Sequence, residues 1–205
     1  MSSRIKRATQ PPKKHIIPFV LMTVLISVLL VAVAVAGSAY ALGQSWLEDL
    51  PDYQKAGAFN VAEKTRVYAS DGETLLAEFY TEDREPVEAS QVSQNVFDAT
   101  IAIEDERFWE HNGVDFPGIM RAIVVDLTGG GRQGASTITQ QFVRQTLLQD
   151  EANDITFKRK AREAYIAMEL EKLYSKEEVL MMYLNTINYG DGAYGIQSAA
   201  KHYFS

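Results

Sequence analysis

The sequence predicts a mainly α protein in which one N-terminal transmembrane helix precedes a helical domain with a small β-hairpin at its start. Three observations predict this fold class. No charged residue occurs from Phe19 to Leu42, which is typical of a membrane span. The dipeptide Asp71-Gly72 separates two short runs rich in β-forming residues, as in a hairpin. From Asn95 onward the apolar residues recur with helical spacing.

The apolar run is long enough for a transmembrane signal anchor, assigned to residues 18–42. At ~1.5 Å per residue it crosses the roughly 30 Å hydrocarbon core. The only charged residues before it are basic, so the N-terminus is expected in the cytoplasm and the following domain outside it. They are Arg4, Lys6, Arg7, Lys13 and Lys14. Ala39-Tyr40-Ala41 resembles a signal-peptidase site, but signal h-regions span only about 7–15 residues. We therefore favour an uncleaved anchor over a cleaved signal peptide.

Charge and composition exclude several classes of function. The net charge is −7, and without the five basic residues of the N-terminal tail 15 basic residues face 27 acidic ones. A body this acidic is a poor general binder of nucleic acid. The absence of cysteine excludes disulfides and thiolate metal sites. The three histidines have no metal-ligand spacing, so zinc is not expected.

The chain divides into a basic tail (1–17), the anchor (18–42), a juxtamembrane linker (43–65) and a globular domain (66–205). Ser175 and Glu178 form a predicted capping box. Tyr203 and Phe204 end the chain with apolar side chains that call for a packing partner, so we expect the domain to continue beyond Ser205. The expected helices cover 93–110, 116–127, 137–149, 156–173, 176–187 and 193–204.

Glu104 is the first carboxylate with a candidate role. On a helix over 93–110, Phe97, Ile101 and Phe108 fall on the same side as Glu104 at 100° per residue. Burying a carboxylate costs several kcal/mol unless it is paired or protonated. Such burial raises the pKa of a carboxyl group toward the range that suits proton transfer. The pattern predicts a buried Glu104 that acts either in proton transfer or in a structural ion pair.

Glu163 is the second carboxylate, and it has cations beside it. Arg159 and Lys160 precede it by four and three residues and share its helix face. A surface salt bridge worth a few tenths of a kcal/mol would explain this spacing. A phosphate site near the helix N-terminus explains it equally, because the helix dipole favours anions there. The residues themselves leave both interpretations open.

The segment from Gly134 to Gln141 is rich in neutral hydrogen-bonding side chains. Thr137 and Gln140 fit a capping box at the start of the next helix. The set also suits sugar hydroxyls and diphosphate oxygens, since a cation follows one turn later. The members of this second interpretation are Ser136, Thr137, Gln140, Gln141 and Arg144.

Five segments carry a family resemblance when they are taken in order. They are Glu104-Asp-Glu-Arg-Phe-Trp-Glu-His-Asn-Gly113, Gly134-Ala-Ser-Thr-Ile-Thr-Gln-Gln141, Arg159-Lys-Ala-Arg-Glu163, Tyr183-Leu-Asn-Thr-Ile-Asn-Tyr-Gly190 and Tyr194-Gly-Ile-Gln-Ser-Ala-Ala-Lys-His-Tyr-Phe204. Residues 66–205 resemble the family-51 glycosyltransferase domain of class A penicillin-binding proteins and monofunctional transglycosylases. The resemblance implies a lysozyme-like helical fold, with a cleft that faces the membrane.

The resemblance also implies a reaction. The substrate is lipid II, the leaving group is undecaprenyl diphosphate, and the product is a β-1,4-linked glycan formed with inversion. Glu104 resembles the general base that takes the proton of the acceptor hydroxyl. Asp105 resembles a neighbouring acid with an orienting role. A second catalytic carboxylate, Glu163, resembles part of a diphosphate site with Arg144, Arg159 and Lys160. Ser136, Thr137, Gln140 and Gln141 resemble donor-site contacts, whereas Asn185 and Gly190 resemble structural residues.

Further expectations follow from the same resemblance. No cofactor is obligatory, although the diphosphate site can include Mg²⁺ or Mn²⁺ near Glu163. The expected partners are lipid II, the growing glycan strand, the cytoplasmic membrane and the cell-wall synthesis machinery, in a single-pass protein of the bacterial cell membrane. The segment 113–134 resembles a mobile jaw whose apolar side contacts the membrane, and core packing explains its apolar residues equally well. They are Phe116, Ile119, Met120, Ile123, Val124, Val125 and Leu127.

Two other functions compete with this interpretation: a lysozyme-like enzyme that cleaves glycan, and an inactive membrane scaffold. Bifunctional members of the family carry a transpeptidase after this domain. Ser198 and Lys201 match the S-x-x-K pattern of such a domain, but its other motifs are absent from the sequence and we reject this site. A solvent-exposed Glu104, or the lack of a cavity between Glu104 and Glu163, would contradict the polymerase interpretation.

Overall fold

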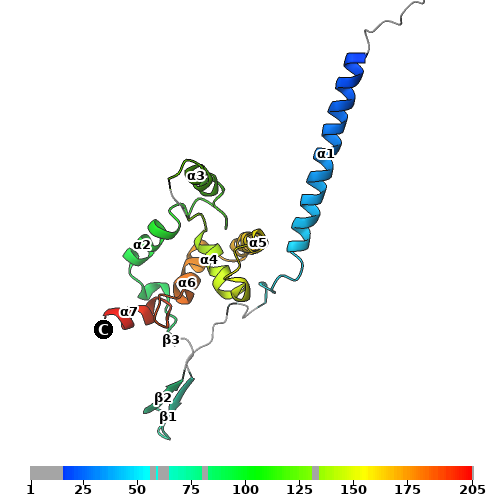
Figure 1. The fold of residues 1–205 in the computed structure, drawn as a ribbon. Coiled ribbons are helices and arrows are strands. Elements are labelled where there is room, and N and C mark those ends of the chain that lie inside the picture. Colours follow the sequence, from blue (N-terminus) through cyan, green and yellow to red (C-terminus); the bar gives the residue numbers. More distant parts are fainter. Residues whose placement is uncertain (1–15, 56–58, 60–64, 80–82, 131–133, 205) are drawn as a thin grey trace, which may run out of the picture. The chain divides into compact units, whose positions relative to one another are not determined.

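The computed structural model describes residues 16–55, 59, 65–79, 83–130 and 134–204 (Figure 1). The chain forms two compact units, Met1–Glu48 and Asp49–Ser205. In the first, helix α1 (Ile16–Trp46) contains an apolar stretch from Pro18 to Trp46 that is long enough to cross a membrane. This helix confirms the predicted apolar N-terminal helix and runs four residues past the expected end at Leu42. The basic side chains of the predicted tail lie outside the described residues.

The second unit contains the remaining elements. The strands are β1 (Thr65–Tyr68), β2 (Leu75–Phe79), β3 (Asp83–Arg84) and β4 (Ala193–Tyr194). The helices are α2 (Gln94–Glu104), α3 (Phe116–Leu127), α4 (Ile138–Thr146), α5 (Phe157–Leu173), α6 (Lys176–Thr186) and α7 (Ile196–Phe204), with short 3-10 turns η2 (Ala89–Gln91) and η3 (Gln149–Glu151). A mainly α fold is therefore confirmed. The lysozyme-like arrangement stays a prediction.

The predicted hairpin is confirmed. Strands β1 and β2 pair antiparallel, with Arg66 opposite Glu78, and Arg66 Nε donates to Glu78 Oε1 at 2.8 Å. In the turn, the Asp71 carboxylate accepts the backbone N–H groups of Glu73 and Thr74. Gly72 has a φ of +75°, a left-handed conformation that glycine adopts without steric cost. Local turn chemistry alone therefore explains why this hairpin was predictable.

The helix expected over 93–110 ends much earlier than predicted. Helix α2 stops at Glu104, and Asp105 leaves the helical conformation with φ −160° and ψ 73°. Phe108 lies beyond this end in a series of turns, where its ring is fully buried. The helical face that was expected to combine Glu104 with Phe108 therefore does not exist. Hydrophobic periodicity continued through the turns because they too bury apolar side chains.

A short parallel pair, β3 with β4, was not predicted from the sequence. It joins residues more than 100 positions apart, with Arg84 in register with Tyr194. The buried Arg84 guanidinium donates to the Thr186 carbonyl at 2.9 Å and lies 4.6 Å from the centre of the Tyr194 ring. Such a pairing depends on tertiary contacts, so no local pattern indicates it.

Helix α4 lies between α5 and α6 at the centre of the unit, as Figure 1 shows. Apolar side chains from these three helices form most of the core, to which α2 adds Ile101 and the following turns add Phe108. The α4, α5 and α6 members include Ile138, Phe142, Val143, Ile166, Leu170, Val179, Tyr183 and Leu184. The polar segment 134–141 leads into the first turn of α4. The packing of α4 therefore holds this segment beside the turns that follow α2.

Gly113 is one position where only glycine fits. Its φ is +83°, and an added Cβ would lie 2.6 Å from the Ala167 carbonyl carbon on α5. We expect Gly113→Ala to lower the free energy of unfolding by roughly 2–5 kcal/mol, from backbone strain plus overpacking. Thermal unfolding of the full chain in detergent measures this change. Gly72→Ala is the matched control, since it has the same backbone strain but open space around its Cβ; equal losses in both variants would contradict the steric argument.

Candidate active site

Glu104 ends α2 with its side chain exposed to solvent. The expectation that it is buried among aromatic rings is wrong, because the helix ends at this residue and the aromatic residues that follow leave its face. The argument from burial therefore gives no support to a catalytic role, and this exposure is the observation that was expected to contradict the polymerase interpretation. That expectation was too strict, because an exposed carboxylate can be reached by a substrate hydroxyl, which a general base requires.

The Glu104 carboxylate contacts two other elements of the fold. Gln141 Nε2 on α4 donates to Glu104 Oε2 at 2.8 Å. The Tyr183 hydroxyl on α6 donates to Gln141 Oε1 at 3.2 Å. Gln141 was expected to contact the donor substrate, but its amide bridges Glu104 and Tyr183 in this structure.

Asp105 joins the turns after α2 to the start of α4. Its carboxylate lies 3.0 Å from His111 Nε2 through both oxygens, and it accepts the Ile138 N–H at 3.0 Å. Asp105 is buried. These contacts agree with the orienting role that the resemblance implied, because they hold the first turn of α4 next to Glu104. A direct contact with substrate would require these bonds to break.

Thr137 and Gln140 form the predicted capping box at the start of α4. The Thr137 hydroxyl also donates to the Gly113 carbonyl at 2.7 Å, and both side chains are buried. This placement favours the structural interpretation for Thr137. Ser136 differs, since it is half-buried and its hydroxyl accepts a hydrogen bond from Lys160 Nζ at 2.7 Å.

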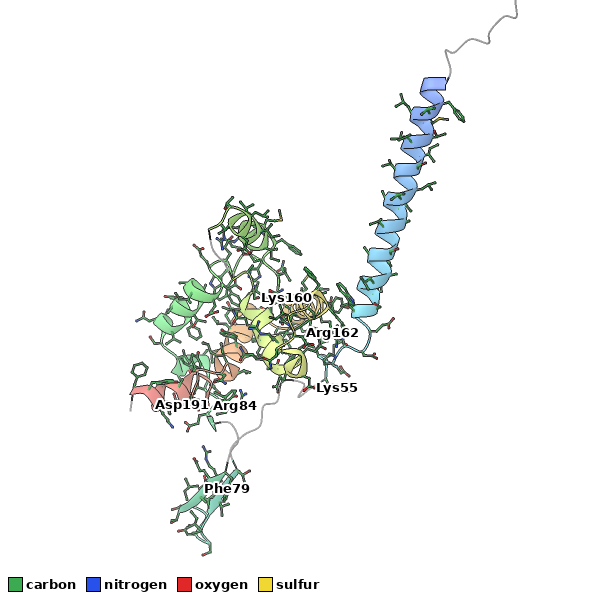
Figure 2. All side chains as sticks on the ribbon, viewed as in Figure 1. Lys55, Phe79, Arg84, Lys160, Arg162 and Asp191 are labelled. Atoms are coloured by element: carbon green, nitrogen blue, oxygen red, sulfur yellow. The ribbon has the colours of Figure 1, made fainter. Side chains whose placement is uncertain are left out.

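Glu163 is fully buried on α5 between two cations. It forms an ion pair with Arg159 and a second one with Lys160, whose Nζ lies 3.2 Å from Glu163 Oε2. The Arg159 side chain is 8% exposed and that of Lys160 is 43% exposed. Figure 2 labels Lys160 on α5. The cation that a ligand can reach is therefore Lys160, and Glu163 holds the pair from behind.

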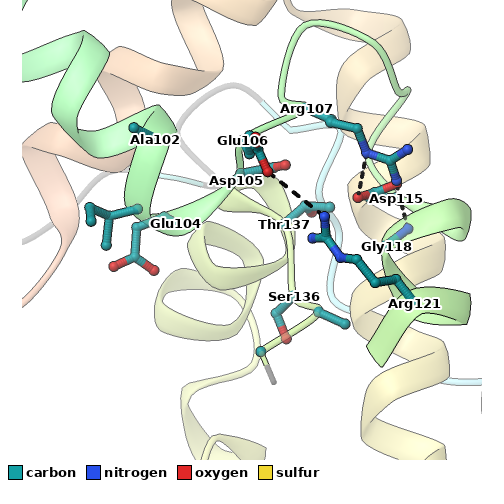
Figure 3. A pocket seen from close by; sticks show the side chains of 13 residues that line it. Ala102, Glu104, Asp105, Glu106, Arg107, Asp115, Gly118, Arg121, Ser136 and Thr137 are labelled. Atoms are coloured by element: carbon teal, nitrogen blue, oxygen red, sulfur yellow. Dashed lines mark hydrogen bonds and ion pairs between the residues drawn. The ribbon is translucent and has the colours of Figure 1, made fainter. Parts of the chain in front are cut away.

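Two cavities adjoin at Gly134, Ala135 and Ser136. A polar pocket of about 140 Å³ is lined by Glu104, Asp105, Ser136 and Thr137, together with Arg107, Asp115 and Arg121 (Figure 3). A larger, mainly apolar groove of about 770 Å³ is lined by Ser136, Gln140 and Lys160, with Phe116, Phe157 and Met168 among its apolar residues. Glu104 therefore lines one cavity and Lys160, which pairs with Glu163, lines the adjoining one, whereas Glu163 itself lines neither.

Asp115 supports the far side of the polar pocket (Figure 3). Its carboxylate pairs with Arg107 and caps α3 through the Gly118 N–H at 3.0 Å. The Arg107 guanidinium, followed by the Gly118 N–H, holds the pKa of Asp115 below its ordinary value of 3.8. The resulting stability is present above that ordinary value and is lost as the pH falls through the lowered pKa.

Asp115→Ala is therefore expected to lower the free energy of unfolding by about 1–2 kcal/mol at neutral pH through loss of the cap and its ion pair. The difference from the unsubstituted chain should shrink as the pH falls below 3.8. Urea unfolding of the full chain in detergent at several pH values tests this. Asp126→Ala, an exposed change on the same helix, is the control; a difference that stays constant down to pH 3 would contradict the ion-pair argument.

The remaining predicted residues are placed as follows. Arg144 is half-buried on α4 near Tyr183, on which its charge acts, and does not line either of these two cavities. Asn185 binds the Val87 backbone through both its amide groups, as expected of a structural residue. On α3, the side chains of Phe116, Met120, Ile123, Val124 and Leu127 are exposed. Core packing therefore does not explain those five residues.

The site residues do not fit a resident metal ion. Among the described residues, no group of three or more His, Asp or Glu side chains could hold one. Glu163 would have to leave Arg159 and Lys160 to bind a cation. We therefore derive no step through a divalent cation.

Sequence reasoning missed two tyrosines beside Glu104. Burial, and next the nearby charge of Glu104, raises the pKa of Tyr183 well above its ordinary value and that of Tyr189 to about 12. Tyr183 begins the segment Tyr183–Gly190, which carries part of the family resemblance, but no role was assigned to it. Its hydroxyl contact across two helices has no signal in local sequence.

A solvent-accessible carboxylate in one cavity and an accessible cation in the adjoining one, on a helical scaffold, are typical of a group-transfer enzyme. The comparisons with known proteins are more specific. The transglycosylase family model matches residues 71–205, and the chain belongs to this family, as the resemblance to family-51 glycosyltransferase domains implied.

Several relatives are similar over most of the chain. Penicillin-binding protein 1A of Escherichia coli is 42% identical over 170 residues, which are 82% of this chain and 20% of that protein. Penicillin-binding protein 2D of Bacillus subtilis is 44% identical over 153 residues, 74% of this chain and 22% of that protein. Penicillin-binding protein 1F of the same organism is 46% identical over 131 residues, 63% of this chain and 18% of that protein. The chain thus spans about a fifth of the length of these relatives.

Proposed function

We propose that this protein polymerises lipid II into β-1,4-linked glycan strands and releases undecaprenyl diphosphate. One observation carries the proposal: the polar pocket with Glu104 adjoins the groove with Lys160 at Ser136. A base and a cation at neighbouring positions match the two ends of a glycosyl transfer, where a hydroxyl loses a proton and a diphosphate leaves.

Glu104 acts as the general base in this proposal. Its carboxylate takes the proton of the acceptor sugar's 4-hydroxyl as that oxygen attacks the donor's anomeric carbon. The bond from that carbon to the diphosphate oxygen breaks on the opposite face, so the configuration inverts. The exposed position of Glu104 gives the hydroxyl access, and the bound substrates themselves exclude water from it.

The positive charge of Lys160 stabilises the negative charge that develops on the leaving diphosphate. Its ammonium group is accessible from the groove and is oriented by Ser136 and Glu163. Arg159 adds a second positive charge behind it, while Gln140 lines the same groove. Charge-assisted hydrogen bonds of this kind are about twice as strong as neutral ones. Glu163 acts by holding the cations rather than by touching the substrate.

The apolar surfaces suit a lipid-linked substrate at a membrane. Helix α1 would anchor the protein with its N-terminus in the cytoplasm and the catalytic domain outside. The exposed apolar side chains of α3 would contact the bilayer surface, and the apolar groove beside Lys160 would hold the first part of the lipid chain. Other proteins of cell-wall synthesis are candidate partners, and Mg²⁺ or Mn²⁺ would assist only as a companion of the bound diphosphate.

Incubation of the full chain with fluorescent lipid II in detergent micelles tests the proposed reaction. We expect glycan strands and undecaprenyl diphosphate, with one diphosphate released for each linkage formed. The same preparation should release no fragments from purified peptidoglycan. Fragment release without polymerisation would support the glycan-cleaving alternative, which needs no cation at a leaving group, and the absence of both activities would support the scaffold alternative.

A further inference from the structure

Three side chains from three helices form a continuous chain of hydrogen bonds that ends on Glu104. The Tyr183 hydroxyl of α6 donates to Gln141 Oε1 at 3.2 Å. Gln141 Nε2 of α4 donates to Glu104 Oε2 at 2.8 Å, at the end of α2. Tyr183 is 2% exposed, whereas Glu104 is exposed. This series of hydrogen bonds therefore extends from the core to the wall of the polar pocket.

The orientation of the Gln141 amide follows from what each neighbour can accept or donate. An ionised carboxylate only accepts hydrogen bonds, so the NH₂ group must face Glu104. The amide oxygen then needs a donor on its other side, and the Tyr183 hydroxyl is that donor. Burial and the charge of Glu104 raise the pKa of Tyr183, which keeps its proton in place across the neutral range.

We propose that Tyr183 and Gln141 are positioning residues that orient the Glu104 carboxylate for proton uptake. This inference rests on the proposed role of Glu104 as the base. Gln141 holds Oε2, which leaves Oε1 to take the proton from the acceptor hydroxyl. Tyr183 acts through Gln141, because its hydroxyl favours the amide orientation that presents NH₂ to the carboxylate.

The orientation of the amide depends on both of its neighbours. A flipped amide would place its oxygen against the Glu104 carboxylate, and both groups would then be acceptors. The Tyr183 hydroxyl adds a donor to the amide oxygen in the observed orientation. Without this hydroxyl the amide is held from one side only, so it orients the carboxylate less well.

Other charged groups near Glu104 stay the same in the variants that test this idea. On α4 Arg144 acts on Tyr183, and the turn after α6 places Tyr189 near the carboxylate. Asp105 and Glu106 follow Glu104 directly in the chain. The other charged residues lining the polar pocket are Arg107, Asp115 and Arg121. Because none is replaced, a change in kcat at unchanged KM reports on the amide network.

Tyr183→Phe keeps the ring in the core and removes only the hydroxyl. We expect kcat for lipid II polymerisation by the full chain to fall about 3–10-fold, because the carboxylate is less well oriented, with KM changed less than twofold. Tyr189→Phe is the matched control, since its hydroxyl is not part of this series of hydrogen bonds, and it should keep the unsubstituted kcat.

A second measurement does not depend on turnover. In the full chain labelled with ¹⁵N-glutamine, the side-chain NH₂ resonances of Gln141 should move in Tyr183→Phe, because the amide oxygen loses its hydrogen-bond donor, and should stay unchanged in Tyr189→Phe. Gln141→Met identifies the resonance by its loss. In kinetics, Gln141→Met combined with Tyr183→Phe should be no worse than Gln141→Met alone, because both changes break one chain.

The outcomes separate this inference from the proposed function. If the unsubstituted chain does not polymerise lipid II, the proposed function itself fails. If Glu104→Gln polymerises lipid II at the unsubstituted rate, the assignment of Glu104 as the base fails, and this inference fails with it. If Glu104→Gln is inactive while Tyr183→Phe keeps both the original kcat and the original Gln141 resonances, only the positioning role is overturned. Strictly multiplicative kinetic losses in the double variant would overturn it as well, since independent residues behave in that way.

Discussion

Glu104→Gln is expected to reduce lipid II polymerisation by about 10³-fold, within the range by which general bases accelerate reactions. Glutamine has nearly the same shape as glutamate but cannot take a proton at neutral pH. Its side-chain oxygen can still accept from Gln141 Nε2, which now donates to Glu104 at 2.8 Å. The fold and the donor groove should therefore stay intact, and the loss should appear in kcat rather than in KM.

Rates of fluorescent strand formation by the full chain measure this loss. Thermal unfolding should change little, since Glu104 is exposed. Glu110→Gln is the matched control, because Glu110 is also exposed, follows in the same series of turns and does not line the polar pocket. Polymerisation by Glu104→Gln at the unsubstituted rate would contradict the assignment of Glu104 as the base.

Glu163→Gln is expected to destabilise the domain as well as impair the reaction. The substitution leaves two cations beside a fully buried neutral side chain, and the Arg159 side chain is only 8% exposed. Breaking a buried ion pair by removing one partner costs about 3–5 kcal/mol. For a chain of this size, such a loss lowers Tm by roughly 6–20 °C. Activity should fall because Lys160 loses the carboxylate that orients it.

Lys160→Met separates the two effects. The Lys160 side chain is 43% exposed and Glu163 keeps its pair with Arg159, so Lys160→Met should lower Tm less than Glu163→Gln does, while raising KM for lipid II about 10-fold or more through loss of a charge-assisted contact. Differential scanning fluorimetry and polymerisation kinetics on the same samples distinguish the variants. If Glu163→Gln kept its Tm and lost only activity, Glu163 would contact the substrate itself, contrary to its buried position.

Much of the local structure was predictable because it depends on neighbouring residues. The bounds of α3 match the predicted 116–127. The ends of α5 and α6 fall within a residue of prediction, since Thr156 and Ser175 cap them through side-chain bonds. Helix α4 ends three residues early, and its continuation becomes a 3-10 turn. Helix α7 begins three residues late, because β4 uses the first residues of the predicted segment.

The sequence predicted which residues form the candidate site better than it predicted how buried each of them is. The spacing of Arg159, Lys160 and Glu163 correctly indicated an ion cluster, because four residues separate neighbours on one helix face. It could not indicate which member is buried, since that depends on what packs against α5. For Glu104 the predicted environment was wrong, because the prediction extended the helix past Asp105.

The sequence by itself determined the apolar N-terminal helix, the hairpin, the capped helices and membership of the transglycosylase family, because composition, turn chemistry and motif order are local properties. Only the tertiary structure decided that Glu104 is exposed, that Glu163 is enclosed and that Tyr183 reaches Glu104 through Gln141. These features arise where α2, α4, α5 and α6 meet. Contacts between helices distant in sequence depend on side-chain packing in three dimensions, which no periodicity along one helix encodes.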